Sequence, residues 1–402
     1  MQANSDYTLL SPSAIEWNAF RALPASEPFA DETIEYLNAL SASLLKDSQT
    51  RQYPDVVTFA FFCRKANLAK LKEIYGNGSA IRLGRGIAFH IAPGNVPVNF
   101  AYTLVTGMLA GNNNIVRVSS KEFPQVDLIV AHMRKLASDE RWSDISQRNA
   151  LVRYDHQSDA TAFFSSFADV RVIWGGNETI KRIREAPLPP RSFDICFAER
   201  YSICAINPDV VAAADDAEMQ SLANSFYNDT YLFDQNACSA PHVVFWKESE
   251  SLDAAKKKFW DAVYKLVSQK YNLQPILSVD KLDALHRLAI ETDAHEVPMP
   301  DNYIVRAELK KLPQNIDDYR CTGGFFAEHS IKNLDEIAPI ITRKYQTLAY
   351  YGFDCVELES FVKQNRLSGI DRIVPVGHTT DFSLTWDGYN LIEAMSRIVD
   401  VI

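Results

Sequence analysis

One cysteine of the chain lies in a sequence that suits nucleophilic chemistry. Cys238 belongs to the run Asp-Gln-Asn-Ala-Cys-Ser-Ala-Pro at residues 234–241, a polar stretch of small side chains directly before a predicted strand. Small neighbours leave room for an acyl group on the sulfur, and the thiolate is the nucleophilic form of cysteine. Most free cysteines are buried and inert, so a packing role is the alternative to a catalytic one.

The other five cysteines fit a packing role better. Cys321 precedes Thr-Gly-Gly and is the one rival to Cys238. The four with aromatic or aliphatic neighbours are Cys63, Cys196, Cys204 and Cys355. There is no C-x-x-C pair and the eight histidines are scattered singly, so we predict no metal site and free thiols in a reducing compartment. His242 follows Cys238 by four residues, but Pro241 and the predicted strand argue against a Cys–His pair.

Two turns, each between a predicted strand and a predicted helix, carry the residues of a phosphate site. The strand ending at Ile91 runs into Ala-Pro-Gly-Asn, and the strand ending at Trp174 runs into two glycines. Glycine lets the backbone approach a ligand, and N–H groups at a helix start favour a phosphate. Together the turns predict a dinucleotide crevice, although each alone suits a plain loop and the G-x-G-x-x-G fingerprint is absent. The turn residues expected to bind the cofactor are Ala92, Pro93, Gly94, Gly175 and Gly176.

A charged side chain interrupts an otherwise apolar strand. Arg117 lies in the run Ile-Val-Arg-Val-Ser-Ser at residues 115–120, near the point where a parallel strand would open onto the crevice. A charge in that place needs a partner. One reading pairs the guanidinium with a carboxylate at the edge of the core. The other uses it to hold the extra phosphate of NADP, for which its bidentate fork is suited.

The remaining pattern must position these residues. The first 80 residues read mostly as helices that form a packing layer. From Ile81 to Ile206, short β-branched or aromatic runs alternate with amphipathic stretches, which predicts βαβ units and a parallel sheet. Its strands are expected at residues 87–91, 115–118, 150–154, 170–174 and 203–206.

A second α/β domain is expected after Pro208. It would contain a strand at residues 242–246 and a long helix at 252–271, and a helical segment at 389–398 would return to complete it. The predicted segments are a helical layer (1–80), a nucleotide-binding domain (81–207), a catalytic thiol domain (208–375) and a C-terminal return or oligomerisation segment (376–402).

Composition limits the class of protein. The 402 residues are 47% apolar and 23% charged, as in an ordinary globular protein of two or three domains. With 41 basic and 51 acidic residues, the formal charge of −10 offers no global positive field to attract nucleic acid. The N-terminal residues lack a secretory signal pattern, and the longest apolar run, near residues 56–63, is too short to span a bilayer. We therefore expect a cytoplasmic protein without a membrane span.

Five motifs occur in an order that resembles a known superfamily. They are Ala-Pro-Gly-Asn-Val-Pro at 92–97, Leu-Ala-Gly-Asn at 109–112, Val-Arg-Val-Ser-Ser at 116–120, Trp-Gly-Gly-Asn-Glu at 174–178 and Gln-Asn-Ala-Cys at 235–238. Their order and approximate spacing are similar to those of the aldehyde dehydrogenase superfamily. The runs Lys-Glu-Phe at 121–123, Gly-Ile-Asp-Arg-Ile-Val-Pro-Val-Gly at 369–377 and Trp-Asp-Gly at 386–388 resemble more closely the LuxC-type acyl-CoA reductases, the fatty acid reductase subunits of bacterial luminescence and their relatives.

The resemblance implies an α/β fold like that of aldehyde dehydrogenases, with two parallel-sheet domains and a small oligomerisation element. It assigns the nucleophile to Cys238 and the donor to the thiohemiacetal oxyanion to Asn95. The ribose-binding lysine of the superfamily aligns with Arg117, and the glutamate three residues later aligns with Ser120. Arg117, Ser119 and Ser120 are therefore expected to bind the cofactor. Losing that carboxylate while keeping a cation makes room for a 2′-phosphate, so the implied cofactor is NADPH.

One departure from the superfamily concerns the reaction. Hydrolytic aldehyde dehydrogenases use a glutamate base in Glu-Leu-Gly-Gly, whereas the matching run Phe-Ala-Glu-Arg-Tyr-Ser at 197–202 lacks the glycines, so the resemblance does not assign that base to Glu199. A thiol acceptor needs less activation than water. The resemblance thus implies reduction of a long-chain acyl-CoA or acyl-protein thioester to the aldehyde through an acyl-cysteine. The alternatives are a hydrolytic enzyme with Glu199 as base and a cysteine acyltransferase without redox activity.

The implied partners are an acyl-CoA or acyl-protein donor, an acyl-protein synthetase subunit and other copies of the chain in a homo-oligomer. Four aromatic residues near the candidate nucleophile fit a tunnel for the acyl chain and a packed core equally well. They are Phe226, Tyr227, Tyr231 and Phe233.

Overall fold

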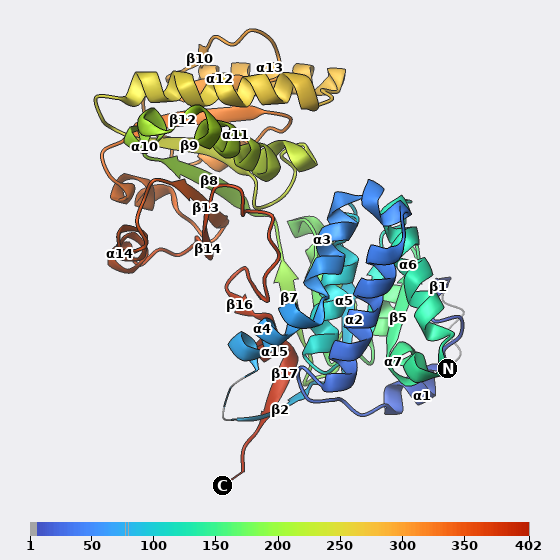
Figure 1. Ribbon diagram of the computed structural model, residues 1–402. Helices are drawn as coiled ribbons and strands as arrows, with labels where there is room; N and C mark the ends of the chain where they lie inside the picture. The colour runs from blue at the N-terminus through green and yellow to red at the C-terminus, as the bar shows by residue number, and fades with distance from the viewer. Residues whose placement is uncertain (1–5, 77, 79, 402) are drawn as a thin grey trace. The chain divides into compact units, whose positions relative to one another are not determined.

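The computed structural model describes residues 6–76, 78 and 80–401, and the chain divides into two compact units (Figure 1). The first unit contains the chain up to residue 198 together with the residues from 384 onward. The second contains residues 199–383.

The first unit is built on a six-stranded sheet in the order β1-β5-β4-β3-β6-β7. All neighbours are parallel except β1, which pairs antiparallel with β5. After β3 the chain adds β4 and β5 on one side and then β6 and β7 on the other, so the strand order reverses between β3 and β6. Ligands of open α/β sheets bind at the carboxyl ends of the strands at such a switch point. The bounds are β1 (Thr8–Ser11), β3 (Ile87–Ile91), β4 (Asn113–Val118), β5 (Asn149–Arg153), β6 (Val170–Trp174) and β7 (Phe193–Phe197).

Helices connect and cover this sheet. The N-terminal helices belong to the same unit, and α2 packs against α5 and α6 (Figure 1). Apolar residues at helical spacing, including Leu37, Leu40 and Leu44, are buried in that contact layer. The bounds are α1 (Trp17–Ala22), α2 (Asp31–Lys46), α3 (Pro54–Phe62), α4 (Lys65–Tyr75), α5 (Asn99–Leu109), α6 (Pro124–Ala137), α7 (Ser143–Gln147), α8 (Ala160–Ser165) and α9 (Asn177–Arg184).

The C-terminal segment corrects one expectation. The prediction of a helix at residues 389–398 that completes the second domain is wrong, because only α15 (Leu391–Met395) is helical. The following β17 (Ser396–Val399) pairs antiparallel with β2 (Ile81–Gly84) in the first unit. A short hairpin precedes α15 and consists of β15 (Thr385–Trp386) and β16 (Tyr389–Asn390). The chain therefore returns to the first unit at its end.

The second unit is built on a seven-stranded sheet in the order β10-β11-β12-β9-β8-β13-β14. Only β10 is antiparallel to its neighbour. The bounds are β8 (Tyr201–Ile206), β9 (Pro241–Lys247), β10 (Ala294–Val297), β11 (Val305–Leu309), β12 (Phe325–Ile331), β13 (Tyr345–Tyr351) and β14 (Arg372–Pro375).

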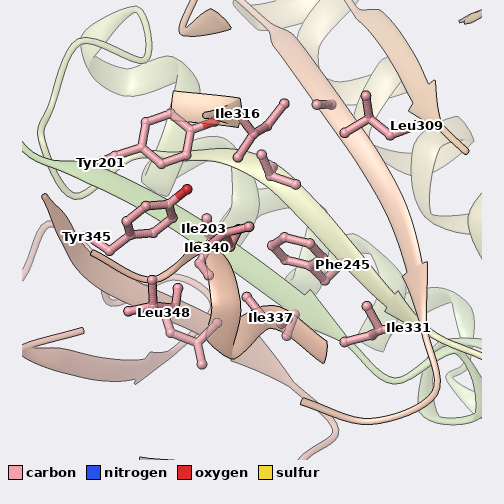
Figure 2. Close-up of a cluster of buried hydrophobic side chains, with 14 of the residues drawn as sticks. Tyr201, Ile203, Phe245, Leu309, Ile316, Ile331, Ile337, Ile340, Tyr345 and Leu348 are labelled. Atoms are coloured by element: carbon pink, nitrogen blue, oxygen red, sulfur yellow. The ribbon is translucent and has the colours of Figure 1, made fainter. Parts of the chain in front are cut away.

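Each face of this sheet carries a buried apolar cluster, because successive side chains of a strand point to opposite faces. Cys204 of β8 and Val244 of β9 pack with α11 (Asp216–Thr230) and α12 (Leu252–Lys270). Ile203 and Phe245 of the same strands pack on the other face, as Figure 2 shows. That face is covered by α13 (Pro275–Glu291), α14 (Cys355–Asn365) and the 3-10 helix η5 (Leu334–Ile340). The helix α10 (Pro208–Ala213) follows β8.

The boundary between the units lies at residues 198 and 199, not after residue 207. The strand β8, expected in the nucleotide-binding domain, lies between β9 and β13 in the second sheet. The first sheet instead ends with β7, a strand that the sequence pattern did not predict. No glycine- or proline-rich linker separates β7 from β8, so the local sequence gives no sign that the chain changes sheets.

The described residues contain neither a cluster of metal-ligating side chains nor a helix fit to cross a membrane. Among those residues, no three histidine, cysteine, aspartate or glutamate side chains gather to hold a metal ion. No helix in the same part of the chain has both the length and the apolar character needed to cross a membrane.

Candidate active site

A cavity of about 340 Å³ opens at the carboxyl ends of β3, β4 and β6, at the switch point of the first sheet. Every site residue predicted in this unit lines it: Ala92, Pro93, Gly94, Asn95, Arg117, Ser119, Ser120, Gly175 and Gly176. The lining residues that sequence reasoning missed are Ile91, His156, Trp174 and Thr179. The structure therefore brings two turns and a strand end, separated by more than 80 residues, into one site.

The sheet register explains why the two glycine turns meet. Ile91, the last residue of β3, lies opposite Ile173 of β6, so both strands end at the same level. The turn after β6 leads directly into α9, whose first residue is Asn177. N–H groups in the first turn of a helix have no partner within the helix, and they favour a negative charge. The cavity thus has the backbone groups of an anion site on one side.

The space that a side chain at residue 94 would occupy is open in this structure. Its φ is not positive, and a Cβ added to it would meet only the Ser119 Oγ, at an ordinary distance of 3.6 Å. The protein itself would therefore tolerate a side chain at residue 94. Because glycine has no side chain, residue 94 leaves room for a ligand in the cavity.

Positive charge gathers at one end of the cavity. Arg117 is 6% exposed, and its Nη2 donates to the Tyr154 carbonyl at 3.2 Å and to His156 Nδ1 at 3.5 Å. Arg182 of α9 donates to the same His156 nitrogen at 3.2 Å. Burial lowers the pKa of Arg117, and burial with the two guanidinium groups lowers the pKa of His156. His156 therefore stays neutral and accepts from both arginines.

The carboxylate reading for Arg117 is wrong. Among the described residues no carboxylate forms an ion pair with Arg117 or Arg182, and Asp155 acts on Arg117 only at longer range. A buried cation without a carboxylate partner is costly unless an anion can bind beside it. The cluster of Arg117, Arg182 and His156 therefore has the chemistry of a phosphate site.

A buried hydrogen-bond chain holds Trp174 in the cavity wall. Trp174 Nε1 donates to Thr103 Oγ1 at 3.2 Å, and that hydroxyl contacts His90 Nδ1 at 2.8 Å. His90 Nε2 contacts Asn114 Oδ1 at 3.1 Å, while the Asn114 amide donates to Asn149 Oδ1 at 2.9 Å. The chain is complete only if His90 is neutral with its proton on Nε2. Burial lowers the pKa of His90 to about 4 and keeps it in that form.

Cys238 lies in the second unit, in the loop between the 3-10 helix η3 (Tyr231–Phe233) and β9. Its side chain is half-buried. The Ser202 hydroxyl of β8 donates to the Cys238 carbonyl at 2.7 Å, and the Thr347 N–H of β13 donates to the same hydroxyl at 3.2 Å. Gln346 Nε2 donates to the Cys238 sulfur at 3.4 Å. The loop is therefore tied to two strands through both the backbone and the sulfur.

Two β-bulges make this arrangement possible. Between Ser202 and Ile203 of β8, the neighbouring strand β9 places an extra residue, His242. On the other side of β8, β13 places an extra residue in its segment Gln346–Thr347. A bulge re-aims side chains locally and is common beside active sites. Here both bulges flank Ser202, the residue that anchors Cys238.

The buried Gln235 side chain gives the loop its shape. Its Oε1 accepts from the Gly324 and Phe325 N–H groups at 3.1 and 3.2 Å. Its Nε2 donates to the Pro241 and Phe325 carbonyls at 2.9 and 3.0 Å. Asp234 and Gln235 both have positive φ, which produces the tight turn before Cys238. The first residue of the Gln-Asn-Ala-Cys motif therefore stabilises the loop that contains its last residue.

The remaining cysteines differ from one another. Cys63 and Cys204 are fully buried, and burial raises the pKa of both thiols, as expected of packing residues. Cys196 and Cys321 are half-buried, and burial also raises the pKa of each. Cys355 is exposed at the start of α14, so the packing role predicted for it is wrong.

His242, Glu199 and the four candidate tunnel residues belong to the second unit. His242 is buried and its ring stacks on Tyr201, 5.3 Å between centroids. Glu199 is exposed in the connection between β7 and β8. Of the candidate tunnel residues, three belong to the core cluster that packs α11 and α12 on the sheet, and the fourth, Phe233, is half-buried. The three core residues are Phe226, Tyr227 and Tyr231.

Comparison with solved structures identifies the fold. Aldehyde dehydrogenase 21 from Physcomitrella patens superposes with a TM-score of 0.66 at 10% identity, covering 95% of this chain and 87% of that one. An NAD-dependent benzaldehyde dehydrogenase from Corynebacterium glutamicum gives 0.62 at 14% identity, covering 94% and 86%. The prediction of an aldehyde-dehydrogenase-like α/β fold is confirmed.

Sequence comparison identifies the family. The long-chain acyl-protein thioester reductase of Photorhabdus laumondii is 21% identical over 309 residues, covering 74% of this chain and 59% of that protein. The reductase of the same name from Vibrio harveyi is 22% identical over 311 residues, covering 74% and 60%. The matched region thus spans about three fifths of these relatives. The model of the family described as acyl-CoA reductase (LuxC) matches residues 19–398, and the chain therefore belongs to this family.

Proposed function

We propose that this chain reduces a long-chain acyl thioester, of CoA or of an acyl-protein, to the aldehyde with NADPH through an acyl-Cys238 intermediate. The observation that carries the proposal is that all nine predicted residues of the first unit line one cavity at the switch point of the sheet. The family match and the names of the relatives, long-chain acyl-protein thioester reductases, support the substrate class.

The cavity residues fit a phosphorylated dinucleotide. The turn residues and the start of α9 offer backbone N–H groups to the pyrophosphate. Arg117 and Arg182 offer guanidinium groups to a 2′-phosphate, which would supply the anion that the buried Arg117 lacks among the described residues. Bound NADPH would supply a hydride to the acyl carbon.

Cys238 would begin the reaction as a thiolate. Its sulfur attacks the thioester carbonyl carbon, a new C–S bond forms, and the donor thiol leaves after taking up a proton. After hydride has reached the acyl carbon, the Asn95 amide stabilises the negative charge on the former carbonyl oxygen. Collapse breaks the C–S bond, releases the aldehyde and returns Cys238 to the thiolate. One acyl thioester, one NADPH and one proton become one aldehyde, one thiol and one NADP⁺.

Product analysis with an acyl-CoA series and NADPH tests this function. We expect aldehyde and free thiol in equal amounts, and neither product from the C238A variant. Free fatty acid formed from aldehyde without a thiol acceptor would favour the hydrolytic alternative. Transfer of the acyl group to a second thiol without oxidation of NADPH would favour the acyltransferase.

The cellular setting belongs to the same proposal. We propose that the chain works in the cytoplasm as a homo-oligomer, beside an acyl-protein synthetase subunit that supplies the acyl-protein. A pull-down of the tagged protein from its source cells, with an acylation assay on the captured material, tests the partner. A sedimentation experiment tests the oligomer.

A further inference from the structure

The amide of Gln346 faces the sulfur of Cys238 in a fixed orientation. Gln346 is 2% exposed, and its Nε2 lies 3.4 Å from the Cys238 sulfur. Thr347 Oγ1 donates to the Gln346 Oε1 at 3.4 Å, so the oxygen end of the amide has its own donor. The N–H end is thereby directed to the sulfur. An N–H donor stabilises a thiolate more strongly than a thiol, because hydrogen bonds to an ionised acceptor are stronger.

A positively charged side chain lies on the strand next to Gln346. Arg372 begins β14 and lies opposite Thr347 of β13, the neighbour of Gln346. It belongs to the Gly-Ile-Asp-Arg motif, for which the proposed function has no role. The pKa of Arg372 is lowered by burial, while Asp381, Asp229 and the charge of Cys238 raise it. By reciprocity, the same interaction favours the charged form of Cys238.

The position of Arg372 is fixed from one side by a loop. Its Nη1 donates to the Thr379 carbonyl at 2.8 Å, and its Nη2 donates to the His378 and Asp381 carbonyls at 3.0 and 2.6 Å. Three backbone acceptors hold the planar guanidinium in one orientation. The guanidinium is therefore held in place by the backbone of residues 378–381.

Buried Asp229 of α11 holds the same loop from the other side. Its Oδ2 accepts from the Gly377 N–H at 2.6 Å, and its Oδ1 accepts from the Thr379 N–H at 3.0 Å. His378 is exposed and pairs with Asp381 at 2.7 Å. The charged and titratable groups around Arg372 include Asp229, His378, Asp381 and Cys238.

A further cation, Arg320, contacts the loop that contains Cys238. Arg320 donates to the Asn236 carbonyl at 3.0 Å and to the Arg200 carbonyl at 3.4 Å. On the loop itself, Asp234 accepts from the Tyr271 hydroxyl at 2.6 Å. Arg320 contacts the loop two residues before the nucleophile, whereas Gln346 contacts the sulfur itself.

We infer that Gln346 and Arg372 are positioning residues that hold the Cys238 sulfur as a thiolate aimed in one direction. The inference rests on the proposed function in that Cys238 is the nucleophile. It also gives a role to two features that the proposed function does not explain. The bulge in β13 directs the Gln346 donor to the sulfur, and the Gly-Ile-Asp-Arg motif supplies the charge of Arg372.

The test measures the pH dependence of alkylation of Cys238 by iodoacetamide in the full chain, without cofactor or acyl donor, with each thiol resolved by mass spectrometry. We expect the midpoint for Cys238 to rise by about one pH unit in R372Q, which is a tenfold lower thiolate fraction well below the midpoint. R372K should restore part of this shift. Q346M, which keeps the volume but removes the donor, should raise the midpoint by about half a unit.

Two controls accompany these variants. The exposed Cys355 in the same samples should keep its midpoint throughout. R343Q removes an exposed arginine just before β13 and should leave Cys238 unchanged. Unchanged midpoints for Cys238 in Q346M and R372Q, both folded by circular dichroism, would overturn the inference. If R372Q does not fold, an unchanged midpoint in folded Q346M overturns it. Since no acyl donor is used, a normal midpoint shift in a protein that produces no aldehyde would refute the proposed function alone.

Discussion

At the residue scale, the most informative side chain of the cavity is Arg117. Its guanidinium is almost fully buried, yet its partners among the described residues are a carbonyl, a histidine nitrogen and the face of Tyr154 at 5.0 Å. None of these carries a negative charge. A phosphate bound beside Arg117 and Arg182 would compensate the cost of burying this cation, and NADPH has such a phosphate where NADH has a hydroxyl.

Arg117→Ala and Arg182→Ala should each lower kcat/KM for NADPH by about 10- to 100-fold, because each removes a charge-assisted hydrogen bond to the 2′-phosphate. The value for NADH should change much less. Steady-state kinetics with both cofactors measure the ratio. Lys181→Ala removes an exposed cation of the same helix that pairs with Glu178, and it serves as the control. Equal losses with both cofactors would contradict a phosphate site.

Gly94→Ala separates stability from binding. The new Cβ meets only the Ser119 Oγ at 3.6 Å, so the melting temperature should stay within about 2 °C of the parent. The same methyl group enters the cavity, and we expect the KM for NADPH to rise by roughly tenfold. Thermal unfolding and cofactor titration measure the two quantities. A large loss of stability would contradict the free space around residue 94, and an unchanged KM would show that this residue does not face the cofactor.

His90 makes the stability of the protein depend on pH. Its pKa is lowered to about 4 in the folded state, while an unfolded histidine titrates near 6.5. The unfolded chain therefore binds more protons between these values, and stability is lost as the pH falls from about 6.5 toward 4. We expect the free energy of unfolding to drop between pH 7 and pH 5 by about 2 kcal/mol more in the parent than in His90→Gln. Urea unfolding at both pH values measures the drop. The same drop in the parent and in His90→Gln would contradict this prediction.

At the element scale, α5 is shaped by the polar chain that it covers. A Cβ on Gly107 would lie 1.9 Å from Asn114 Oδ1 and 2.8 Å from His90 Nε2. Glycine to alanine within a helix usually stabilises a protein by about 1 kcal/mol. Gly107→Ala should instead destabilise this protein by about 2 kcal/mol or more, because it displaces buried hydrogen-bonded groups. Urea unfolding measures the sign, and a gain in stability would show that the contact relaxes at little cost.

The strands and helices around the cavity follow from local sequence. β3 and β6 are short β-branched runs ended by a turn with glycine, and both were predicted with the bounds that the structure has, Ile87–Ile91 and Val170–Trp174. Sheet membership was not predictable in the same way. From the sequence, β8 looks like another strand of the first domain and β17 looks helical. The partner of each strand lies far away in the chain, β13 for β8 and β2 for β17, so the local sequence does not reveal it.

The same distinction applies to the site. The cavity residues were predictable because they lie within the motifs themselves. His156 and Arg182 were missed because neither lies in a motif: His156 follows β5, and Arg182 lies within α9. Only the packing brings His156 to Arg117 and Arg182 to His156. The support of Cys238 by Gln346 depends on a bulge in β13, which has no local sequence signal.

At the scale of the whole molecule, the two halves of the proposed chemistry belong to different units. The cofactor cavity is lined by residues of the first unit alone, and the hydrogen bonds that hold Cys238 come from the second unit alone. The account therefore predicts that acyl transfer to Cys238 and reduction of the acyl group are separable events. Removing the cofactor should stop the second without stopping the first.

The most direct test is a single-turnover experiment with acyl-CoA labelled in the acyl group. Without NADPH, we expect close to one label per chain on the peptide that contains Cys238, none in Cys238→Ala, and normal labelling in Arg117→Ala. Addition of NADPH should then release the label as aldehyde from the parent, and at a much lower rate from Arg117→Ala. Label retained in Cys238→Ala, or aldehyde formed without any label ever appearing on Cys238, would contradict the account.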